Sequence, residues 1–467
     1  MGLIIFVLGG ALVAFIIIGT PICMALGTAA SVGILAFMRN TQFNQLVSIA
    51  YAQSTSINQL VAPLFVLMAE FLAQGGVAGD IFSVLSRKFR GFKAGLAISA
   101  TLTSTVFAAL CGSSAATTAA IGRISIKEMI DRGYDPAFTC GVVMAGGTLG
   151  IMIPPSMPFV LYGIITEASI AKLFMAGVIP GLMLSVMFCI FAIVRIKLNP
   201  DLCKTIESKK DYKPTDEDAA AVIEKIESLK KKNAKYSNAD KNRTEENLLS
   251  QPEDTVGFRI VFPFLLIIFV LGSIYTGIAT PTEAAGVGVM GSFIIVLLTR
   301  RMNIRVLTQI FAQASRTSAM ILMLSMCGLG LTYVVSFLGI ASAISEAIAA
   351  SGLSRWSVMI LVYFMWLILG CLMDPGSMVV LTVPFILPTL NELGFDTIWV
   401  GVVSTLMVEV GMITPPVGLN LFVTKSLTEV PMKDIIRGAF PYLLIFGIAL
   451  LLLSMFPQLA LWLPGRM

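Results

Sequence analysis

The stretch Gly146-Gly-Thr-Leu-Gly-Ile-Met-Ile-Pro-Pro-Ser-Met-Pro158 places three glycines and three prolines inside an apolar region where a helix would be expected. Glycine and proline are the two residue types least compatible with a helix interior. In a membrane, backbone that is not helical is tolerated only where protein covers it or where it lines a water-filled cavity. The stretch therefore predicts an interrupted membrane helix whose freed backbone groups face a binding site.

Composition assigns the chain to the polytopic membrane proteins. Of its 467 residues, 57% are hydrophobic and 13% are charged, a balance that soluble domains do not have. A bilayer core of about 30 Å takes roughly 20 apolar residues per helix, and such segments predict about eight full spans and two re-entrant hairpins. Residues 3–18 are the predicted first span, because no basic segment precedes them as in a cleaved signal peptide.

The residue inventory excludes several kinds of chemistry. The chain has no histidine, which rules out Ser-His-Asp hydrolysis and His-Glu-x-x-His metalloprotease chemistry. Its 7 cysteines are scattered without a Cys-x-x-Cys pair, so structural thiols are the better interpretation. No phosphate-binding loop of the GxxxxGK[ST] type occurs, so any energy that the protein uses must come from an ion gradient or from another chain.

A polar segment divides the apolar chain into two halves, 1–198 and 257–467. Residues 199–256 hold 13 of the 27 acidic and 11 of the 32 basic side chains, and they predict a solvent-exposed cytoplasmic linker. Motifs recur between the halves at a spacing of 260 or 261 residues, which predicts an internal repeat. The matching pairs are Thr20-Pro21 and Thr280-Pro281, Gly133-Tyr134-Asp135 and Gly394-Phe395-Asp396, and Gly150 to Pro155 and Gly411 to Pro416.

Basic residues predict how the halves are oriented in the membrane. Residues 94–129 are apolar with basic clusters at both ends, which predicts a re-entrant hairpin that enters from the cytoplasm. The counterpart at 356–390 predicts a second hairpin that enters from outside. The repeats would then have inverted topology, with both chain ends outside the cytoplasm. The predicted fold class is an all-α polytopic membrane protein with two inverted repeats, re-entrant helical hairpins and broken helices.

Breaks in helices lie at predicted membrane depth twice in each half, at 110–118, 146–158, 373–377 and 409–416. The N-terminus of a half-helix carries partial positive charge and unpaired N–H groups that hold anions. Freed carbonyls and small hydroxyls coordinate sodium, so facing sets of breaks predict two ion sites around a substrate site, as in a secondary transporter. For the Gly-Ser-Ser tip at 112–114, close helix packing is the alternative interpretation.

Two carboxylates, Asp374 and Glu409, lie at predicted membrane depth. Such a charge costs at least about 2.5–3.5 kcal/mol there, so a functional role is favoured over a structural one. Thr148 occupies the position of Glu409 in the first repeat, so the two ion sites should differ in charge. Sodium is favoured over protons because histidine is absent, although both acids could carry protons. Glu70 and Glu283, near predicted helix ends, are interpreted as interfacial or capping groups.

Segments in both halves resemble the large membrane subunit of tripartite ATP-independent periplasmic (TRAP) transporters. These segments are Leu110 to Gly122, Gly146 to Pro158, Thr280 to Ala285 and Gly411 to Asn420. The resemblance covers nearly the whole chain apart from the insertion 199–256. It implies a multi-pass protein of the bacterial cytoplasmic (inner) membrane with the elevator fold of the ion-transporter superfamily. It also implies sodium-driven import of a C4-dicarboxylate or sialic acid, with a small four-helix membrane subunit, a periplasmic substrate-binding protein, no organic cofactor and no nucleic acid.

The resemblance also implies which residues form the sites. The first sodium site would lie at the first tip and in an unwound segment from Gly147 to Pro154, with Gly112, Ser113, Ser114, Gly147, Thr148, Gly150 and Pro154. The second sodium site would comprise Asp374, Gly376, Ser377, Glu409, Gly411 and Thr414. The substrate carboxylate would lie near Ser114, Pro155, Ser156 and Asn420, where Asn420 could equally serve packing.

Alternatives of two kinds stay open on the sequence. A standalone sodium/dicarboxylate symporter of the same superfamily would share the fold and need no binding protein. An intramembrane enzyme could use Asp374 and Glu409 as paired carboxylates, but nothing else in the sequence favours hydrolysis.

Overall fold

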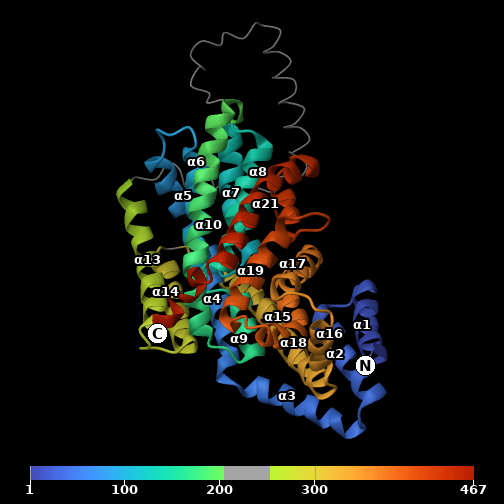
Figure 1. The fold of residues 1–467 in the computed structure, drawn as a ribbon. Helices are drawn as coiled ribbons and strands as arrows, with labels where there is room; N and C mark the ends of the chain where they lie inside the picture. Colours follow the sequence, from blue (N-terminus) through green and yellow to red (C-terminus); the bar gives the residue numbers. More distant parts are fainter. Residues whose placement is uncertain (1, 204–252, 300, 467) are drawn as a thin grey trace.

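The computed structural model describes residues 2–203, 253–299 and 301–466, and their regular structure is helical apart from one isolated bridge between Tyr134 and Cys203 (Figure 1). The helices of the first half are α1 Gly2–Ile17, α2 Ile22–Phe37, α3 Phe43–Thr55, α4 Val61–Gln74, α5 Val77–Lys88, α6 Gly95–Cys111, α7 Ser114–Asp131, α8 Pro136–Met152, α9 Met157–Thr166 and α10 Ile170–Leu198. Those of the second half are α13 Glu253–Tyr275, α14 Pro281–Leu298, α15 Ile304–Phe337, α16 Ile340–Ala350, α17 Arg355–Leu372, α18 Pro375–Glu392, α19 Thr397–Ile413, α20 Leu419–Leu427, α21 Met432–Met455 and α22 Gln458–Leu461. Short 3-10 helices are η1 Asn40–Gln42, η2 Ile57–Leu60, η3 Pro200–Leu202 and η4 Pro464–Arg466. The predicted linker 199–256 lies mostly outside the described residues and stays a prediction.

Helix boundaries recur with the spacing of the sequence motifs. α18 begins 261 residues after α7, and α19 begins 261 residues after α8. One difference is the 34-residue α15, which takes the place of both α3 and α4 of the first half. Pro63 lies in the first turn of α4, where its missing N–H and its ring prevent one helix from continuing through. The equivalent position in the second half is Leu324, which allows α15 to continue as one helix.

Both predicted hairpins are present. The first consists of α6 and α7, joined by Gly112 and Ser113, and the second consists of α17 and α18, joined at Asp374. Gly112 has a φ of 63°, in the left-handed region that residues with a Cβ avoid. At each tip a side chain caps the second helix, since Ser113 accepts from the N–H of Ala116 and Asp374 accepts from the N–H of Ser377. Each tip is therefore a tight turn that ends in a helix N-terminus.

The breaks in the two long interrupted helices are narrower than the sequence predicted. Only residues 153–156 leave the helix between α8 and α9, and only 414–418 leave it between α19 and α20. The prediction that 147–154 is unwound was wrong for all but its last two residues. The glycines there are helical and serve packing, because a Cβ on Gly147 would lie 1.8 Å from the Thr118 hydroxyl oxygen. Glycine thus lets α7 approach α8 closely.

Several helical segments are long enough to span a membrane. Within the described residues, seven helical segments are long and apolar enough to cross a membrane, and five shorter apolar helices accompany them. α1 and α2 have 16 residues each, fewer than the roughly 20 of a full span. The predicted first span at 3–18 is therefore a short helix. Figure 1 shows both termini in the lower half of the view, and their predicted location outside the cytoplasm stays a prediction.

The helices form two packed groups. In the first group α6, α7, α10, α19 and α21 surround α8, whose residues from Phe138 to Met152 are all buried. In the second group α4 packs on α14 and α15, and α2 packs on α1 and α15. α9 packs on α18 and on α10 and α19 of the first group, and α18 also packs on α19. The two groups meet where α4 contacts α6 and where α15 contacts α9 and α18. Both hairpins therefore lie against helices of the second group.

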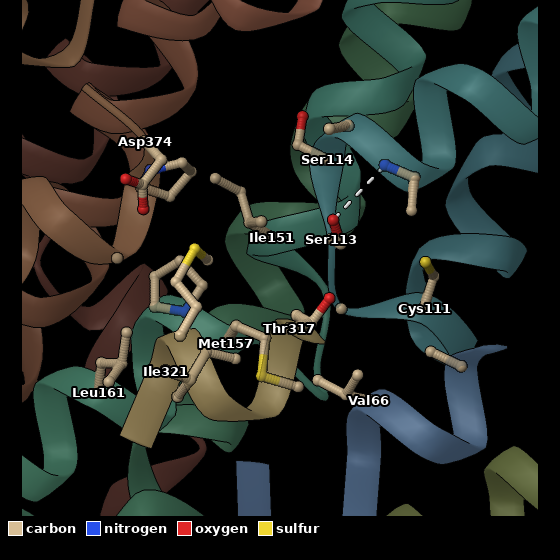
Figure 2. Close-up of a pocket in the computed structure, with 18 of the residues that line it drawn as sticks. Val66, Cys111, Ser113, Ser114, Ile151, Met157, Leu161, Thr317, Ile321 and Asp374 are labelled. Carbon is tan, nitrogen blue, oxygen red and sulfur yellow. Dashed lines mark hydrogen bonds between the residues drawn. The ribbon is translucent and has the colours of Figure 1, made fainter. Parts of the chain in front are cut away.

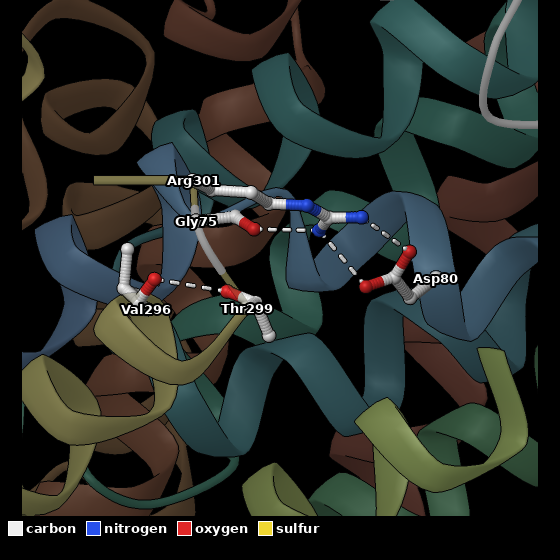
Figure 3. A network of polar contacts seen from close by, with 5 residues as sticks. All are labelled: Gly75, Asp80, Val296, Thr299 and Arg301. Atoms are coloured by element: carbon white, nitrogen blue, oxygen red, sulfur yellow. Dashed lines mark hydrogen bonds and ion pairs between the residues drawn. The ribbon is translucent and has the colours of Figure 1, made fainter. Parts of the chain in front are cut away.

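An ion pair joins the turn between α4 and α5 to the second half of the chain. The Arg301 guanidinium donates to both carboxylate oxygens of Asp80 at 2.9 Å and to the Gly75 carbonyl at 2.7 Å (Figure 3). Arg301 lies between α14 and α15, and Asp80 lies in the first turn of α5. Because the Asp80 side chain is only 5% exposed, this bidentate ion pair is largely shielded from water. It holds the start of α5 against the second group of helices.

Candidate functional site

The two hairpin tips line one cavity of about 340 Å³ (Figure 2). Residues 111–116 line it from the first hairpin, and residues 374–376 line it from the second. Figure 2 shows Asp374 across the cavity from Ser113 and Ser114. Side chains beside both helix breaks complete this wall. The fold thus brings together the tips that belong to different halves of the sequence.

The opposite wall of this cavity comes from α4 and α15. Among mainly apolar side chains it contains Glu70 from α4 and Gln313 and Thr317 from α15. Within the described part of the chain, the charged residues of the lining are Glu70 and Asp374, without any lysine or arginine. The interpretation of Glu70 as an interfacial or capping group missed this position, although a carboxylate inside a membrane helix by itself indicates a functional site. Glu283, in contrast, caps α14 as expected.

A hydrogen bond ties the first tip to the second helix break. Asn420 Nδ2 donates to Ser114 Oγ at 2.8 Å, and both side chains are buried. Ser114 begins α7, and Asn420 lies in the first turn of α20. Asn420 Oδ1 has no hydrogen-bond partner among the described residues, so this oxygen is left to accept from a ligand or from water. These two predicted substrate residues therefore lie together, although their elements come from different halves.

Asp374 is the N-cap of α18 and the acidic group of the second tip. Its Oδ2 accepts from the Ser377 N–H at 3.0 Å, and the Ser377 hydroxyl donates to Oδ1. The carboxylate thereby satisfies the Ser377 N–H, one of the groups at the start of α18 that have no partner within the helix. It is half-buried and lines the cavity, so its remaining lone pairs can face a cation. Gly376 beside it also lines the cavity, where a Cβ would lie 2.8 Å from the Leu161 side chain.

Glu409 is fully buried in α19. Within the described residues, neither of its carboxylate oxygens has a hydrogen-bond partner. An isolated buried carboxylate is strongly unfavourable unless it is neutralised or lies beside a cation. The equivalent Thr148 is equally buried but satisfied, since its hydroxyl donates to the Ala145 carbonyl at 2.6 Å. The halves therefore differ here in hydrogen bonding as well as in charge.

Close backbone approaches account for two further glycines among the predicted ion-site residues. A Cβ on Gly150 would lie 2.6 Å from the Ser113 carbonyl oxygen, at the first tip. A Cβ on Gly411 would lie 2.3 Å from the carbonyl carbon of Gly370 in α17. Both glycines let a hairpin helix pack directly on the backbone of an interrupted helix. Neither glycine lines the cavity itself, so what the structure shows for both is close helix packing.

The breaks themselves use their hydroxyls internally. The segment 154–156 is buried and is not part of the cavity wall. The Ser156 hydroxyl donates to the Ile151 carbonyl, and the Thr414 hydroxyl donates to the Val410 carbonyl at 2.6 Å. Of the predicted substrate residues, Ser114 lines this cavity, whereas Pro155, Ser156 and Asn420 do not.

The chain matches the family described as "Tripartite ATP-independent periplasmic transporter, DctM component" over residues 10–459. It is also 32% identical over 444 residues to the C4-dicarboxylate TRAP transporter large permease protein DctM of Pseudomonas aeruginosa, with 94% of each chain covered. The chain belongs to this family. TRAP large permeases are transporter subunits and not enzymes, which excludes the intramembrane enzyme as an alternative. They are multi-pass proteins of the bacterial inner membrane that work with a small membrane subunit and a periplasmic binding protein.

Other similar proteins extend the comparison. The ectoine TRAP transporter large permease protein TeaC of Halomonas elongata is 26% identical over 457 residues, with 97% of both chains covered. Among solved structures, the YdaH transporter of Alcanivorax borkumensis has a TM-score of 0.59 at 12% identity, covering 95% of this chain and 97% of that one. At this identity the likeness concerns the fold alone. The names of the TRAP relatives point to different substrates.

Proposed function

We propose that this chain is the pathway through which a sodium gradient drives the import of an organic acid, of the C4-dicarboxylate or sialic acid class, delivered by the periplasmic binding protein. The observation that carries the proposal is the cavity of about 340 Å³ that both hairpin tips line. The first tip presents the N-terminus of α7, whose N-cap is the neutral Ser113, and helix N-termini attract carboxylate groups. The N-terminus of α18 at the second tip is already capped by the Asp374 carboxylate. The first tip can thus hold a substrate carboxylate between the two hairpins once the acidic groups of the lining are balanced by cations.

The charges around the cavity support coupling to sodium. Its lining contains two carboxylates and, within the described residues, no basic side chain. An anionic substrate would be repelled by such a lining unless cations accompany it. One sodium ion at the first tip and one at the second, near Asp374 and Glu409, would supply the positive charge. Carbonyls freed at helix breaks are the ligands that bind sodium in other transporters with interrupted helices.

An elevator mechanism agrees with the two packed groups of helices. The cavity lies at their boundary, with hairpins and breaks on one side and α4 and α15 on the other. If the halves 1–198 and 257–467 are inverted repeats, the group around α8 and α19 can move against the group around α4 and α15. The hairpin tips would then carry the site with them past α4 and α15, and rigid-body movement of one bundle against another is a common way to alternate access.

Uptake into proteoliposomes tests the proposal. The complex of this chain and its small membrane subunit is reconstituted, the cognate binding protein is added outside, and uptake of radiolabelled succinate and sialic acid is measured. We expect uptake of one of these acids only with an inward sodium gradient. Equal uptake when potassium replaces sodium, at the same membrane potential, would contradict sodium coupling. Uptake of neither acid, with sodium-driven uptake of a non-carboxylate such as isethionate, would contradict the substrate class.

The alternative of a standalone sodium/dicarboxylate symporter makes a different prediction in the same assay. It requires succinate uptake at the full rate when the binding protein is left out. We expect uptake to be lost in that condition, because the chain matches large permeases of tripartite systems over nearly its whole length.

A further inference from the structure

A second cavity, of about 270 Å³, lies where the α5–α6 connection meets the α7–α8 connection, toward the upper end of the view in Figure 1. Three basic residues line it, Arg90 and Lys93 from the first connection and Arg132 from the second. Its lining, within the described chain, contains no acidic residue. The cavity therefore presents concentrated positive charge at a distance from the transport cavity, with which it shares no lining residue.

Hydrogen bonds hold the main chain around this basic cavity in one shape. The Tyr134 hydroxyl donates to the Lys93 carbonyl at 2.5 Å and accepts from the Leu96 N–H at 3.4 Å. Burial raises the pKa of Tyr134, so its hydroxyl keeps the proton that it donates. The Cys203 thiol donates to the same Lys93 carbonyl at 3.3 Å. The basic side chains thus extend from a rigid frame, as a preorganised binding site requires.

Acidic groups neutralise only part of this charge. Arg132 pairs with Glu128, one turn earlier in α7, at 2.5 Å. Neither Arg90 nor Lys93 forms an ion pair with any residue in the ranges that the structure describes. Asp135, on the same connection as Arg132, is engaged as the N-cap of α8, where it accepts from the Phe138 N–H at 2.8 Å. Two cations are therefore available to an anionic ligand.

The position of the basic cavity indicates a ligand from the membrane surface. Ala94, the N-cap of α6, offers no side-chain hydrogen bond, so the first turn of α6 adds partial positive charge. Phe92, between Arg90 and Lys93, is 66% exposed, which suits an aromatic ring at the membrane–water interface. The basic clusters predict that this end of the molecule is cytoplasmic, and anionic headgroups attract basic pockets on that side.

We propose that this cavity binds the phosphate group of an anionic phospholipid headgroup. Arg90 and Lys93 hold the phosphate oxygens, and the N-terminus of α6 faces them. Phe92 anchors the loop where the acyl chains begin. The bound lipid joins the α5–α6 connection to the α7–α8 connection, at the base of the first hairpin. A soluble phosphate shares part of this chemistry, but it would leave the exposed Phe92 without a partner.

Lipid retention by the purified complex tests this assignment. The complex with the small membrane subunit is incubated with phosphatidylglycerol or with phosphatidylcholine, and bound lipid is counted by native mass spectrometry. We expect the wild type to retain phosphatidylglycerol preferentially. Arg90→Gln/Lys93→Gln should lower that retention about ten-fold, because each basic side chain near anionic lipid contributes to binding. Both side chains are exposed, so the variant should fold, and size-exclusion chromatography checks this.

The matched control is Lys88→Gln/Lys127→Gln, which removes the same charge from exposed residues outside the cavity lining. We expect it to retain phosphatidylglycerol like the wild type. An equal loss in both double variants would show attraction to the general surface charge and would overturn the proposal. Displacement of phosphatidylglycerol by millimolar inorganic phosphate would assign the site to a soluble phosphate and would also overturn it. Retention without preference over phosphatidylcholine would contradict the requirement for an anionic headgroup.

Discussion

The break between α8 and α9 and the break between α19 and α20 occupy the same place in their halves but have different surroundings. Pro154-Pro155 is buried, whereas Pro415-Pro416 is exposed. Inside the preceding helices, the Thr148 hydroxyl donates to a backbone carbonyl, whereas the Glu409 carboxylate has no hydrogen-bond partner among the described residues. The two halves therefore share the position of the break in the helix, but they differ in its burial and in the polar side chain of the preceding helix.

This difference indicates how each break is stabilised. Non-helical backbone at membrane depth must be covered by protein or must face water. The first break is covered by the first tip, where a Cβ on Gly112 would lie 2.5 Å from the Pro155 carbonyl oxygen. The second break is open, and Asn420 just beyond it bonds to Ser114 of the first hairpin. We therefore expect substitutions in the second half to have the largest effects on how uptake depends on sodium and on substrate.

The largest effect is expected from Glu409→Gln, which removes the charge that distinguishes the second half. Interactions with a charged group contribute roughly 1.5–3 kcal/mol, so sodium-driven uptake should fall about ten-fold or more if Glu409 faces a sodium ion. Initial uptake rates over a range of sodium concentrations measure this. Thr148→Val, at the equivalent position, should stay near the wild-type rate. Unchanged sodium dependence in Glu409→Gln would remove Glu409 from the ion site.

Arg301→Gln tests a second difference between the halves. This difference lies between the turn after α4 in the first half and the turn after α15 in the second half. The α4–α5 turn is held by Arg301 and Asp80, whereas a Cβ on Gly339, in the turn after α15, would meet nothing within 4 Å. Leaving the buried Asp80 unpaired should lower the free energy of unfolding by about 3 kcal/mol. Thermal unfolding in detergent measures the change.

The matching double variant Arg301→Gln/Asp80→Asn leaves no buried charge behind and should recover part of that stability. Equal stability of the wild type and Arg301→Gln would show that the ion pair does not hold the α4–α5 turn.

Alanine at the paired glycines tests whether the packing of the two halves is equivalent. A Cβ on Gly411 would meet the backbone of Gly370, and one on Gly150 would meet the Ser113 carbonyl. Forcing an extra methyl group into such a contact typically costs about 1–3 kcal/mol, so both variants should unfold at lower temperature. Gly286→Ala in α14 is the control, since a Cβ there meets nothing within 4 Å. A lower unfolding temperature in only one of the two variants would show that the packing of the two halves is not equivalent.

The smallest effect is expected for the hydrogen bond that links the halves at the site. Ser114→Ala, Asn420→Ala and their combination form a double-mutant cycle. Hydrogen bonds between membrane helices contribute about 0.6 kcal/mol on average, so the coupling energy from thermal unfolding should be of this size. Additive effects of the two substitutions would show that the Asn420–Ser114 contact does not stabilise the fold.

Local residue chemistry was enough to predict the hairpins and the existence of the breaks. Gly112 with its left-handed φ and Asp374 as an N-cap act within one turn of the chain, so the sequence around them predicts a tip. The same reasoning predicted that the first break begins at Gly147, whereas α8 continues to Met152. A glycine that interrupts a helix and a glycine that packs against a neighbour look alike in sequence, and Thr118 across from Gly147 separates the two cases.

The sequence by itself determined the membrane class, the repeat and the hairpins, because composition, recurring motifs and turn preferences can be recognised along the chain without knowing how its helices pack. Only the tertiary structure decided that both tips line one cavity, that Glu70 faces it, and that Asn420 bonds to Ser114, 306 residues away. Contacts over such separations depend on how helices pack side chain against side chain. Spacing along one chain does not contain that information.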